Sequence, residues 1–434
     1  MLDTFKGDIS LSLAIFQCLN KCGVYMADTA SDNSSPAPVG EWRVVILVTL
    51  IQFINIVDFM MVIPLGPDFA QALGIIMSDL GLIGGSYTFA AATSGFLLSR
   101  HLDRFDRRKI AIWALAGLSV STFAATLAVD QATLMMSRIC AGLFGGPASA
   151  IGLAMIIDVV PVKRRGRAMA IAMGSFSVAA IVGIPFGLEL SARYGWQAPF
   201  YAIALSGIML LVALYLLLPR MVSHIQQQGE AKAVGPIMLL KKPLTRLALM
   251  LVVVSMFGNF LLIPNLSAYV QFNLEFPRER IGELYMMGGV FSLVGMQLTG
   301  YLSDRLGSVL TGSVVCLGLA TVLWVGFIQV PPFEWVLWIF TGFMVFSSAR
   351  RVAQSALTSQ TPDAHERAAF TSVQSACQHV ATGAASVGSS YLLTANADGT
   401  LEGIAFLSQI TLILVLAQPV MMWLLKQRLQ HKPT

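Results

Sequence analysis

Asp58 is the residue of this chain whose type and position best suit proton chemistry. It lies about midway along an apolar run near residues 44–66, and Gln52 and Asn55 share its helix face. A carboxylate within a membrane costs about 2.5–3.5 kcal/mol or more unless it is paired, hydrated or protonated. Proton-coupled exchange needs a group that changes protonation between conformations. We therefore interpret Asp58 as a proton site or a cationic-substrate site, with a purely structural ion pair as the alternative.

Arg138 is the expected partner of Asp58. It lies in the outer part of an apolar run near residues 132–158. An arginine side chain stays charged, so it requires a partner or water. The sequence predicts that Arg138 pairs with Asp58 and modulates its titration. The alternative is a pair that only locks two helices together.

Arg350 and Arg351 lie within the later apolar run near residues 334–358. Adjacent residues of a helix point about 100° apart, so at most one of the two faces a cavity squarely. The seventh, ninth and eleventh apolar runs of the chain contain no acid, and the tenth has only Glu334, its first residue. An anionic substrate group or Asp58 is therefore an expected partner. Snorkelling or hydrogen bonding to carbonyl groups is the alternative.

Polar and aromatic side chains within the apolar runs are further candidates for lining a substrate cavity. With Arg350 they form a set of nine: Gln52, Asn55, Tyr87, Asn259, Asn265, Gln297, Arg350, Gln354 and Gln378. Hydrogen bonds between helices explain such residues equally well. The sequence has no Walker-type phosphate loop and no serine–histidine or metal-ligand cluster. It therefore predicts no enzyme, no metal and no cofactor.

The composition determines which elements must position these groups. Of 434 residues, 56% are hydrophobic and 12% are charged, whereas soluble proteins carry about 25% charged residues. The five cysteines lie mostly within apolar runs and look like small buried hydrophobes. The chain is therefore expected to be a polytopic membrane protein.

Twelve apolar runs are long enough to cross about 30 Å of hydrocarbon as helices. They lie near residues 44–66, 79–99, 109–129, 132–158, 168–191, 198–218, 245–269, 282–302, 309–329, 334–358, 369–394 and 403–425. Backbone groups in lipid must be satisfied internally, and runs of this length exclude barrel strands. The expected fold class is an all-α membrane protein with twelve transmembrane helices.

The lysines and arginines predict the orientation. Of 28 such residues, 22 fall on the side of the two termini and three lie within spans. The other three, Arg193, Arg278 and Arg280, fall on the opposite side. Positive charge collects in the cytoplasm, so both termini are predicted to be cytoplasmic in an inner (plasma) membrane. Residues 1–42 form a polar, disordered tail, in which Met26 is a possible true start.

The two halves of the chain repeat each other. Asp103-Arg104 corresponds to Asp304-Arg305, the stretch 59–64 to 260–264, and 161–169 to 362–370, each at an offset of about 200 residues. Repeated halves around a central site are typical of secondary transporters. We expect two pseudo-symmetric six-helix bundles, residues 43–218 and 245–425, joined by a cytoplasmic linker at 219–244 and followed by a tail at 426–434.

These motifs resemble those of the major facilitator superfamily over about residues 43–425. The family's loop motif reads roughly Gly-x-x-x-Asp-Arg-x-Gly-Arg-Arg, and here Asp103, Arg104, Arg107 and Arg108 match it. Ser99 and Asp106 replace the two glycines, which predicts a looser turn. The second copy keeps both glycines, Gly300 and Gly307, together with the Asp304-Arg305 pair. The resemblance implies that the two copies form a cytoplasmic gate.

The fifth apolar run carries Gly183, Pro185 and Gly187, which are similar to the antiporter signature of the family's efflux branch. The resemblance implies alternating access and proton-coupled efflux of a small organic solute, drug-like or sugar-like. Uptake or exchange of an anionic metabolite is the alternative, and a non-transporting sensor or lipid-modifying enzyme is a third. The expected partners are that solute, protons and the lipid bilayer, with no nucleic acid and a monomeric state.

Overall fold

The computed structural model describes residues 39–102, 105–219, 221, 236–329, 331–363 and 366–430. Met26 and the predicted tail, together with Asp103 and Arg104, lie outside the described residues. The chain divides into two units, residues 1–42 and 43–434, and the second contains the helical bundle.

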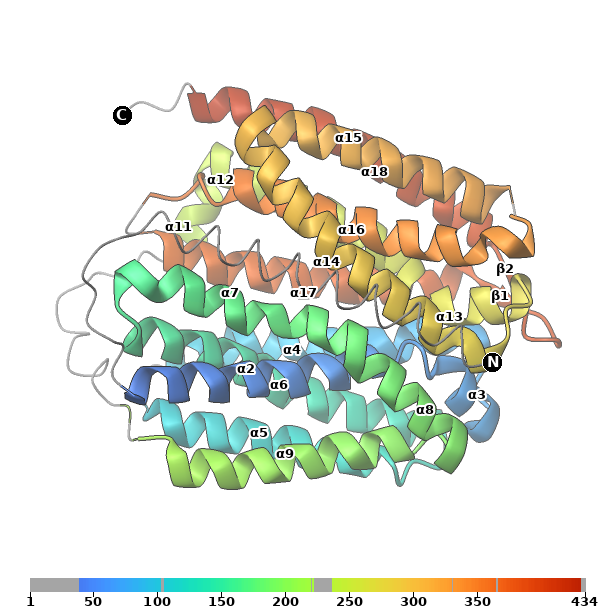
Figure 1. Ribbon diagram of the computed structural model, residues 1–434, viewed down its shortest axis with the longest axis horizontal. Helices are drawn as coiled ribbons and strands as arrows, with labels where there is room; N and C mark the ends of the chain where they lie inside the picture. Colours follow the sequence, from blue (N-terminus) through green and yellow to red (C-terminus); the bar gives the residue numbers. More distant parts are fainter. Residues whose placement is uncertain are drawn as a thin grey trace, which may run out of the picture. The chain divides into compact units, whose positions relative to one another are not determined.

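The first half of this unit is a series of helices joined by short turns (Figure 1). They are α2 (Val39–Met61), α3 (Gly66–Leu73), the 3-10 turn η1 (Met77–Asp79), α4 (Leu80–Leu102), α5 (Arg107–Ala125), α6 (Gln131–Val159), α7 (Val162–Val178), the π-helical turn η2 (Ala179–Gly183), α8 (Ile184–Tyr194) and α9 (Ala198–Leu217). The helices α7 and α8 continue each other through η2, so they represent one predicted span.

The second half repeats this order. It contains α11 (Pro236–Lys241), α12 (Pro243–Leu262), η3 (Ile263–Asn265), α13 (Leu266–Ala268), η4 (Tyr269–Asn273), η5 (Arg278–Arg280), α14 (Ile281–Leu306), α15 (Ser308–Leu323), η6 (Trp324–Ile328), η7 (Phe333–Trp335), α16 (Val336–Thr358), α17 (Arg367–Leu392) and α18 (Ile404–Gln430). Before α18, β1 (Thr394–Ala395) and β2 (Leu401–Glu402) form an antiparallel hairpin that pairs Thr394 with Glu402 and Ala395 with Leu401.

The bundle has two ends with different chemistry. One end, where α2 begins and α18 ends, lies at the left of Figure 1; it contains the starts of α5, α7 and α12 with Arg107, Arg164 and Lys242, and we call it the basic face. The other end, at the right, contains α3 and the β1–β2 hairpin, and we call it the hairpin face. Each long helix runs from one face toward the other.

Nine helical segments among the described residues are long and apolar enough to cross a membrane. Three predicted spans, now α4, α5 and α17, do not meet that criterion. The helix α4 packs against α6 and α17, and α5 packs against α6 and α9. Helices that face other helices tolerate small and polar residues, as the Ser, Thr and Gln positions of α17 illustrate.

Two prolines end the first helix of each half earlier than the apolar runs predicted. The helix α2 stops at Met61, before Pro64, and α12 stops at Leu262, before Pro264. Proline lacks a backbone N–H and clashes with the preceding turn, which favours the end of a helix before it. The prediction that Asp58 lies midway along its helix was therefore wrong, since Asp58 is three residues from the end of α2.

Two aspartates cap helices of the first half. The Asp130 carboxylate accepts the backbone N–H of Thr133 at the start of α6, and hydrogen bonding to Thr133 lowers the pKa of Asp130. Asp106 caps α5 by accepting the backbone N–H groups of Arg108 and Met221, both at 3.0 Å. Asp106, which replaces a glycine of the family motif, thus fixes the start of α5 through these two hydrogen bonds.

Candidate functional site

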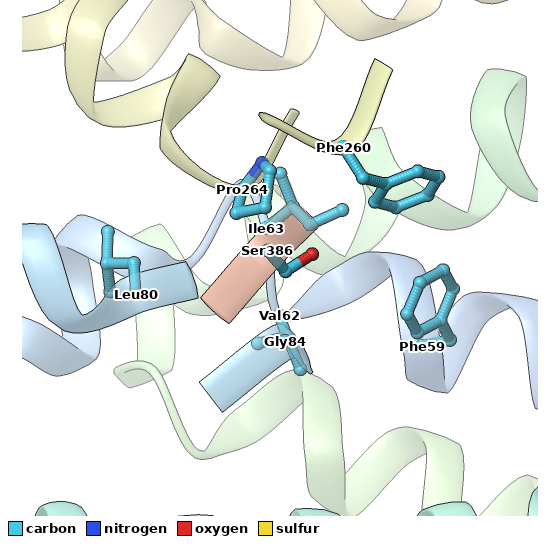
Figure 2. A pocket seen from close by; sticks show the side chains of 8 residues that line it. All are labelled: Phe59, Val62, Ile63, Leu80, Gly84, Phe260, Pro264 and Ser386. Atoms are coloured by element: carbon cyan, nitrogen blue, oxygen red, sulfur yellow. The ribbon is translucent and has the colours of Figure 1, made fainter. Parts of the chain in front are cut away.

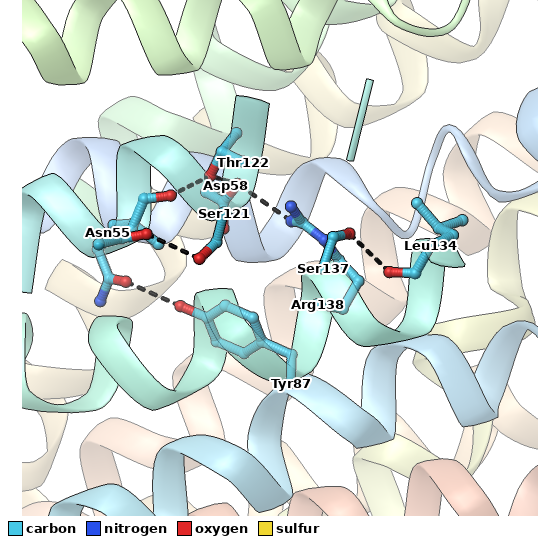
Figure 3. Close-up of polar contacts among 10 residues, drawn as sticks. Asn55, Asp58, Tyr87, Ser121, Thr122, Leu134, Ser137 and Arg138 are labelled. Atoms are coloured by element: carbon cyan, nitrogen blue, oxygen red, sulfur yellow. Dashed lines mark hydrogen bonds and ion pairs between the residues drawn. The ribbon is translucent and has the colours of Figure 1, made fainter. Parts of the chain in front are cut away.

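The centre of the first half is a fully buried ion pair (Figure 3). Arg138 of α6 donates from Nη1 to Oδ1 of Asp58 in α2 over 3.1 Å, and both side chains are 0% exposed. The hydroxyl of Thr122 in α5 donates to the same oxygen at 2.7 Å. Asp58 therefore links three helices. The attraction between the two charges is strong here because water does not screen it.

The pair is not fully satisfied by its surroundings. Within the part of the chain that the structure describes, Oδ2 of Asp58 and the Nε and Nη2 of Arg138 have no hydrogen-bond partner. The ring of Phe200 in α9 covers the guanidinium, with 5.1 Å between Cζ and the ring centroid. Buried polar atoms are usually bonded, so each exception needs an explanation. One oxygen of the Asp58 carboxylate thus has no donor beside it among the described residues.

Gln52 and Asn55 bind different helices, although they lie on the same helix as Asp58. Gln52 exchanges two hydrogen bonds with Ser149 of α6, at 3.1 and 2.9 Å. Asn55 accepts the Tyr87 hydroxyl of α4 at 2.8 Å (Figure 3). A Cβ at Gly145 of α6 would lie 2.2 Å from that hydroxyl, so only glycine leaves room for the Asn55–Tyr87 pair.

The second half contains a related arrangement without the acid. Arg350 of α16 is 0% exposed and donates from Nη2 to Oδ1 of Asn259 in α12 at 2.7 Å and to the carbonyl of Ser255 at 3.3 Å. Asn259 is 201 positions after Asp58, the offset of the repeat. The side chain of Arg351 contacts a different helix: its Cζ lies 4.9 Å from the ring centroid of Phe176 in α7.

The remaining cavity candidates are separated from one another. Asn265 donates to the Ser389 hydroxyl of α17 at 3.0 Å, and Gln354 donates to Gln418 of α18 at 2.7 Å. These are hydrogen bonds between helices of the second half. Gln378 of α17 is half-buried, and Gln297 of α14 is exposed. The structure therefore does not gather the nine predicted residues into one site.

The repeated stretches 59–64 and 260–264 meet between the halves. The ring centroids of Phe59 and Phe260 are 6.3 Å apart, and Tyr87 lies 5.3 Å from Phe59. Figure 2 shows a small pocket beside these rings. Its lining is mostly apolar and comes from both halves: Phe59, Val62, Ile63, Leu80, Gly84, Phe260, Pro264 and Ser386. Aromatic rings with a nearby polar pair suit a small organic solute.

A cross-half ion pair lies beyond this pocket, at the hairpin face. Arg278 of η5 donates from Nε to Oδ1 of Asp68 in α3 at 2.7 Å, and its Nη2 contacts Oδ2. The Ser191 hydroxyl of α8 donates to the same carboxylate at 3.0 Å. The Ser267 hydroxyl of α13 also crosses between the halves, to the carbonyl of Pro64 at 3.2 Å. These contacts close the hairpin face, and we call the Asp68–Arg278 pair the hairpin latch.

The described ion pairs of the basic face lie within single halves. Arg107 of α5 binds Asp158 of α6, with 3.0 Å between Nε and Oδ2. Lys242, just before α12, lies 2.6 Å from Glu366 and 3.6 Å from Asp363. The hydrogen bond to Glu366 raises the pKa of Lys242. These contacts do not tie one half to the other, in contrast to the hairpin latch.

The other predicted gate residues differ in their contacts and in their exposure. Arg108 donates to the carbonyl of Tyr215 in α9. Gly307 ends α14 with a φ of 89°, a conformation that favours glycine, and Gly300 faces Val352 of α16. Asp304 is exposed, and Arg305 lies over the ring of Tyr301. Ser99 belongs to α4, but its side chain is outside the described residues, as are Asp103 and Arg104.

The fifth-span motif allows close helix packing. A Cβ at Gly183 would lie 2.7 Å from Val57 of α2, and one at Gly187 would lie 2.1 Å from Met61. Pro185 lies against Gly282 of α14. The motif thus places the fifth span against α2 beside Asp58 and against the second half.

Sequence reasoning missed three side chains that contact the buried ion pair or join the two halves: Thr122, Phe200 and Asp68. Thr122 and Phe200 contact the ion pair from α5 and α9, and no spacing in the sequence connects them to Asp58. A signal for Asp68 was present in the sequence. Asp68 is an acid on the side opposite the two termini, where Arg278 is one of only three predicted basic residues.

We expect that replacing Arg278 with glutamine loosens the hairpin face. A partly exposed ion pair contributes about 1 kcal/mol or less, so the open population should rise by up to about fivefold. The readout is maleimide labelling of a cysteine at Val62, which is buried in the closed state. Arg280 is the matched control, because it pairs with Glu283 within its own half at the same face. Equal labelling rates in the two variants would contradict the latch.

The sequence model of the Major Facilitator Superfamily matches residues 48–431. The uncharacterized MFS-type transporter YceJ of Bacillus subtilis (strain 168) is 23% identical over 258 residues, which are 59% of this chain and 66% of that protein. The purine ribonucleoside efflux pump NepI of Salmonella paratyphi A (strain ATCC 9150 / SARB42) is 25% identical over 252 residues, 57% of this chain and 62% of that protein. The matched part thus spans less than two thirds of the length of either relative.

Solved structures share the fold at low sequence identity. A bacterial homolog of the human lysosomal transporter Spinster, in an inward-facing and unoccupied conformation, superposes with a TM-score of 0.70 at 15% identity, covering 91% of this chain and 99% of that chain. A D-xylose–proton symporter superposes with a TM-score of 0.68 at 16% identity, covering 88% and 97%. Both support a fold of twelve helices in two bundles.

Proposed function

This chain belongs to the Major Facilitator Superfamily, and from that premise we propose that it exports a small organic solute in exchange for protons by alternating access. The chain is a multi-pass membrane transporter rather than an enzyme. Its coupled ion, direction and solute are the proposed parts. The proposed domains are two bundles, residues 43–218 and 245–425, with the linker 219–244 and the tail 426–434 in the cytoplasm of a bacterium.

The observation that carries the proposal is the fully buried Asp58–Arg138 pair with its free Oδ2. A proton on this carboxylate removes the counter-charge of Arg138, which must then find water, another acceptor or a substrate group. Because Asp58 also holds Thr122 of α5, protonation changes the contacts among three helices at once. The binding of a proton therefore changes the free energy of substrate binding, and substrate binding changes the free energy of proton binding by the same amount.

We also propose an orientation in the membrane, which the charges and the closed end support. We propose that the basic face is cytoplasmic, because Lys and Arg collect there. The hairpin face, closed by the hairpin latch and the Phe59–Phe260 contact, would then face the outside. We propose that this arrangement belongs to an inward-facing state, in which a solute enters from the cytoplasm. The mechanism as proposed works in a monomer, since all of these contacts lie within one chain.

The groups in and near the small pocket support an uncharged or partly apolar solute. Phe59 and Phe260 line it with their rings, and Tyr87, whose hydroxyl binds Asn55, lies next to Phe59 outside the lining. Such a set suits drug-like, sugar-like or nucleoside-like molecules. NepI, a purine ribonucleoside efflux pump by name, makes nucleosides a reasonable first member of the panel.

A second candidate function is uptake or exchange of an anionic metabolite. The observation that favours it is Arg350, which is fully buried and bound only to neutral acceptors among the described residues. If Arg350 becomes accessible during the transport cycle, it could pair with a carboxylate or a phosphate of the substrate.

Proteoliposomes distinguish the two functions. Purified protein is reconstituted with an imposed pH gradient or none, and uptake of labelled nucleosides, sugars, cationic dyes and organic anions is measured. The proposal expects accumulation of a neutral or cationic solute only when the compartment that receives it is the more acidic one. Accumulation of an organic anion with no response to the gradient would favour the second function, and an absence of any proton flux with all solutes would contradict the first.

A further inference from the structure

Two arginines among the described residues, Arg138 and Arg350, are 0% exposed, and they differ in their acceptors. Arg138 has the carboxylate of Asp58 beside it, at 3.1 Å. Arg350, which is equally buried at 0% exposure, has only the Asn259 amide oxygen and the Ser255 carbonyl. An arginine does not lose its proton in a protein. The charge of Arg350 is therefore unneutralised by the contacts that the structure shows.

No acid of the neighbouring helices can supply the missing charge. The helices that pack around α12 and α16 include α15, α17 and α18, and none of these five sequences contains Asp or Glu. The helix α14 also packs against α16, but its two acids, Glu283 and Asp304, lie near its ends and are exposed. A lone charge in a membrane interior is strongly disfavoured.

The unused donors of Arg350 point to what is missing. A guanidinium has five N–H groups, and the contacts to Asn259 and Ser255 use only Nη2. Among the described residues, Nε and Nη1 of Arg350 have no partner, and neither has the Ser255 hydroxyl. The Ser255 hydroxyl belongs to the residue whose carbonyl already binds the guanidinium. Donors without an acceptor, around one positive charge, form a site for an anion.

From these contacts we infer that the second half binds one small inorganic anion of the halide class between α12 and α16, beside Nη1 of Arg350 and the Ser255 hydroxyl. The complete burial of Arg350 favours a small ion over an organic substrate in this conformation. The anion neutralises Arg350 as the Asp58 carboxylate neutralises Arg138. Each half then holds one fully buried arginine with one counter-charge, a side chain in the first half and a bound ion in the second.

The inference can be tested without any transported substrate. Thermal unfolding of the purified protein is measured in sodium chloride, sodium bromide and sodium gluconate at equal ionic strength. We expect chloride and bromide, but not gluconate, to raise the Tm in a saturable way by about 2–4 °C between 1 and 100 mM. Bromide should also give an anomalous diffraction peak next to the Arg350 guanidinium. An identical Tm in the three salts would overturn the inference.

Two variants assign the effect to this site. Asn259→Asp places a carboxylate at the position equivalent to Asp58, so the Tm in gluconate should rise and the halide effect should disappear. Arg350→Gln removes the charge, so the halide effect should also disappear. Arg351→Gln is the matched control, because this arginine faces Phe176 instead, and its halide effect should equal that of the wild type. A halide shift that persists in Arg350→Gln would place the ion elsewhere and overturn the inference.

Discussion

Replacing Asp58 with asparagine is expected to abolish proton-driven transport while the protein remains folded. The amide cannot take up a proton, so the link between protonation and the contacts of Arg138 and Thr122 is lost. The coupling free energy of linked sites is about 1–3 kcal/mol, and we expect accumulation driven by a pH gradient to fall by about 100-fold. Substrate counterflow, which needs no proton movement, should persist.

The fold is expected to tolerate this change because the chain already contains its equivalent. In the second half Arg350 is buried against Asn259, whose amide oxygen accepts the guanidinium at 2.7 Å. An asparagine at position 58 can accept from Arg138 in the same way. Truncation to alanine removes the acceptor as well, and loss of one partner of a buried pair costs about 3–5 kcal/mol. Asp58→Ala should therefore lower the Tm more than Asp58→Asn.

Glu189→Gln is the matched carboxyl-to-amide control, because Glu189 forms an exposed pair with Arg193. It should leave both the gradient-driven rate and counterflow unchanged. Uphill transport at the wild-type rate by Asp58→Asn would remove Asp58 from the coupling mechanism. Loss of counterflow together with gradient-driven transport would instead place Asp58 in substrate binding.

Replacing Gly81 with valine is expected to keep the hairpin face open and to stop transport. A Cβ on Gly81 of α4 would lie 2.1 Å from the carbonyl oxygen of Ser386 in α17 and 2.5 Å from the Ser390 hydroxyl. The first of these atoms belongs to the helix backbone and cannot turn aside. The helix α4 must therefore move away from α17, which is a contact between the two halves. An alternating-access transporter that cannot close one face cannot complete its cycle.

The measurement combines transport with the labelling of a cysteine at Val62. Gly81→Val should label at least about tenfold faster than the parent, because more than 1.4 kcal/mol of steric conflict separates the closed from the open state. Gly95→Val is the matched control on the same helix, since a Cβ there meets nothing within 4 Å. A Gly81→Val protein that transports normally would show that the close approach of α4 and α17 is not needed for function.

The Asp58–Arg138 contact shows how far sequence reasoning reaches at the site. An isolated charge in a membrane costs free energy, so the sequence predicts that Asp58 and Arg138 form an ion pair. The same reasoning names an anionic group or Asp58 as the partner of Arg350, whereas Arg350 binds the Ser255 carbonyl, the kind of contact that the alternative named, and the Asn259 amide oxygen. It does not predict that Asn259, the repeat counterpart of Asp58, binds Arg350, although the offset of 201 residues was visible.

The sequence by itself determined the helices, because hydrophobicity over about 20 residues and the need to satisfy the backbone in lipid are local properties. Twelve spans, a repeat and the basic end of the bundle followed from it. Only the tertiary structure decided that Thr122 and Phe200 contact the buried pair, that Asp68 meets Arg278, and that Gly81 lies against Ser386. These contacts join segments far apart in the chain, and they depend on helix rotation and depth, which the apolar pattern of a membrane helix leaves almost undetermined.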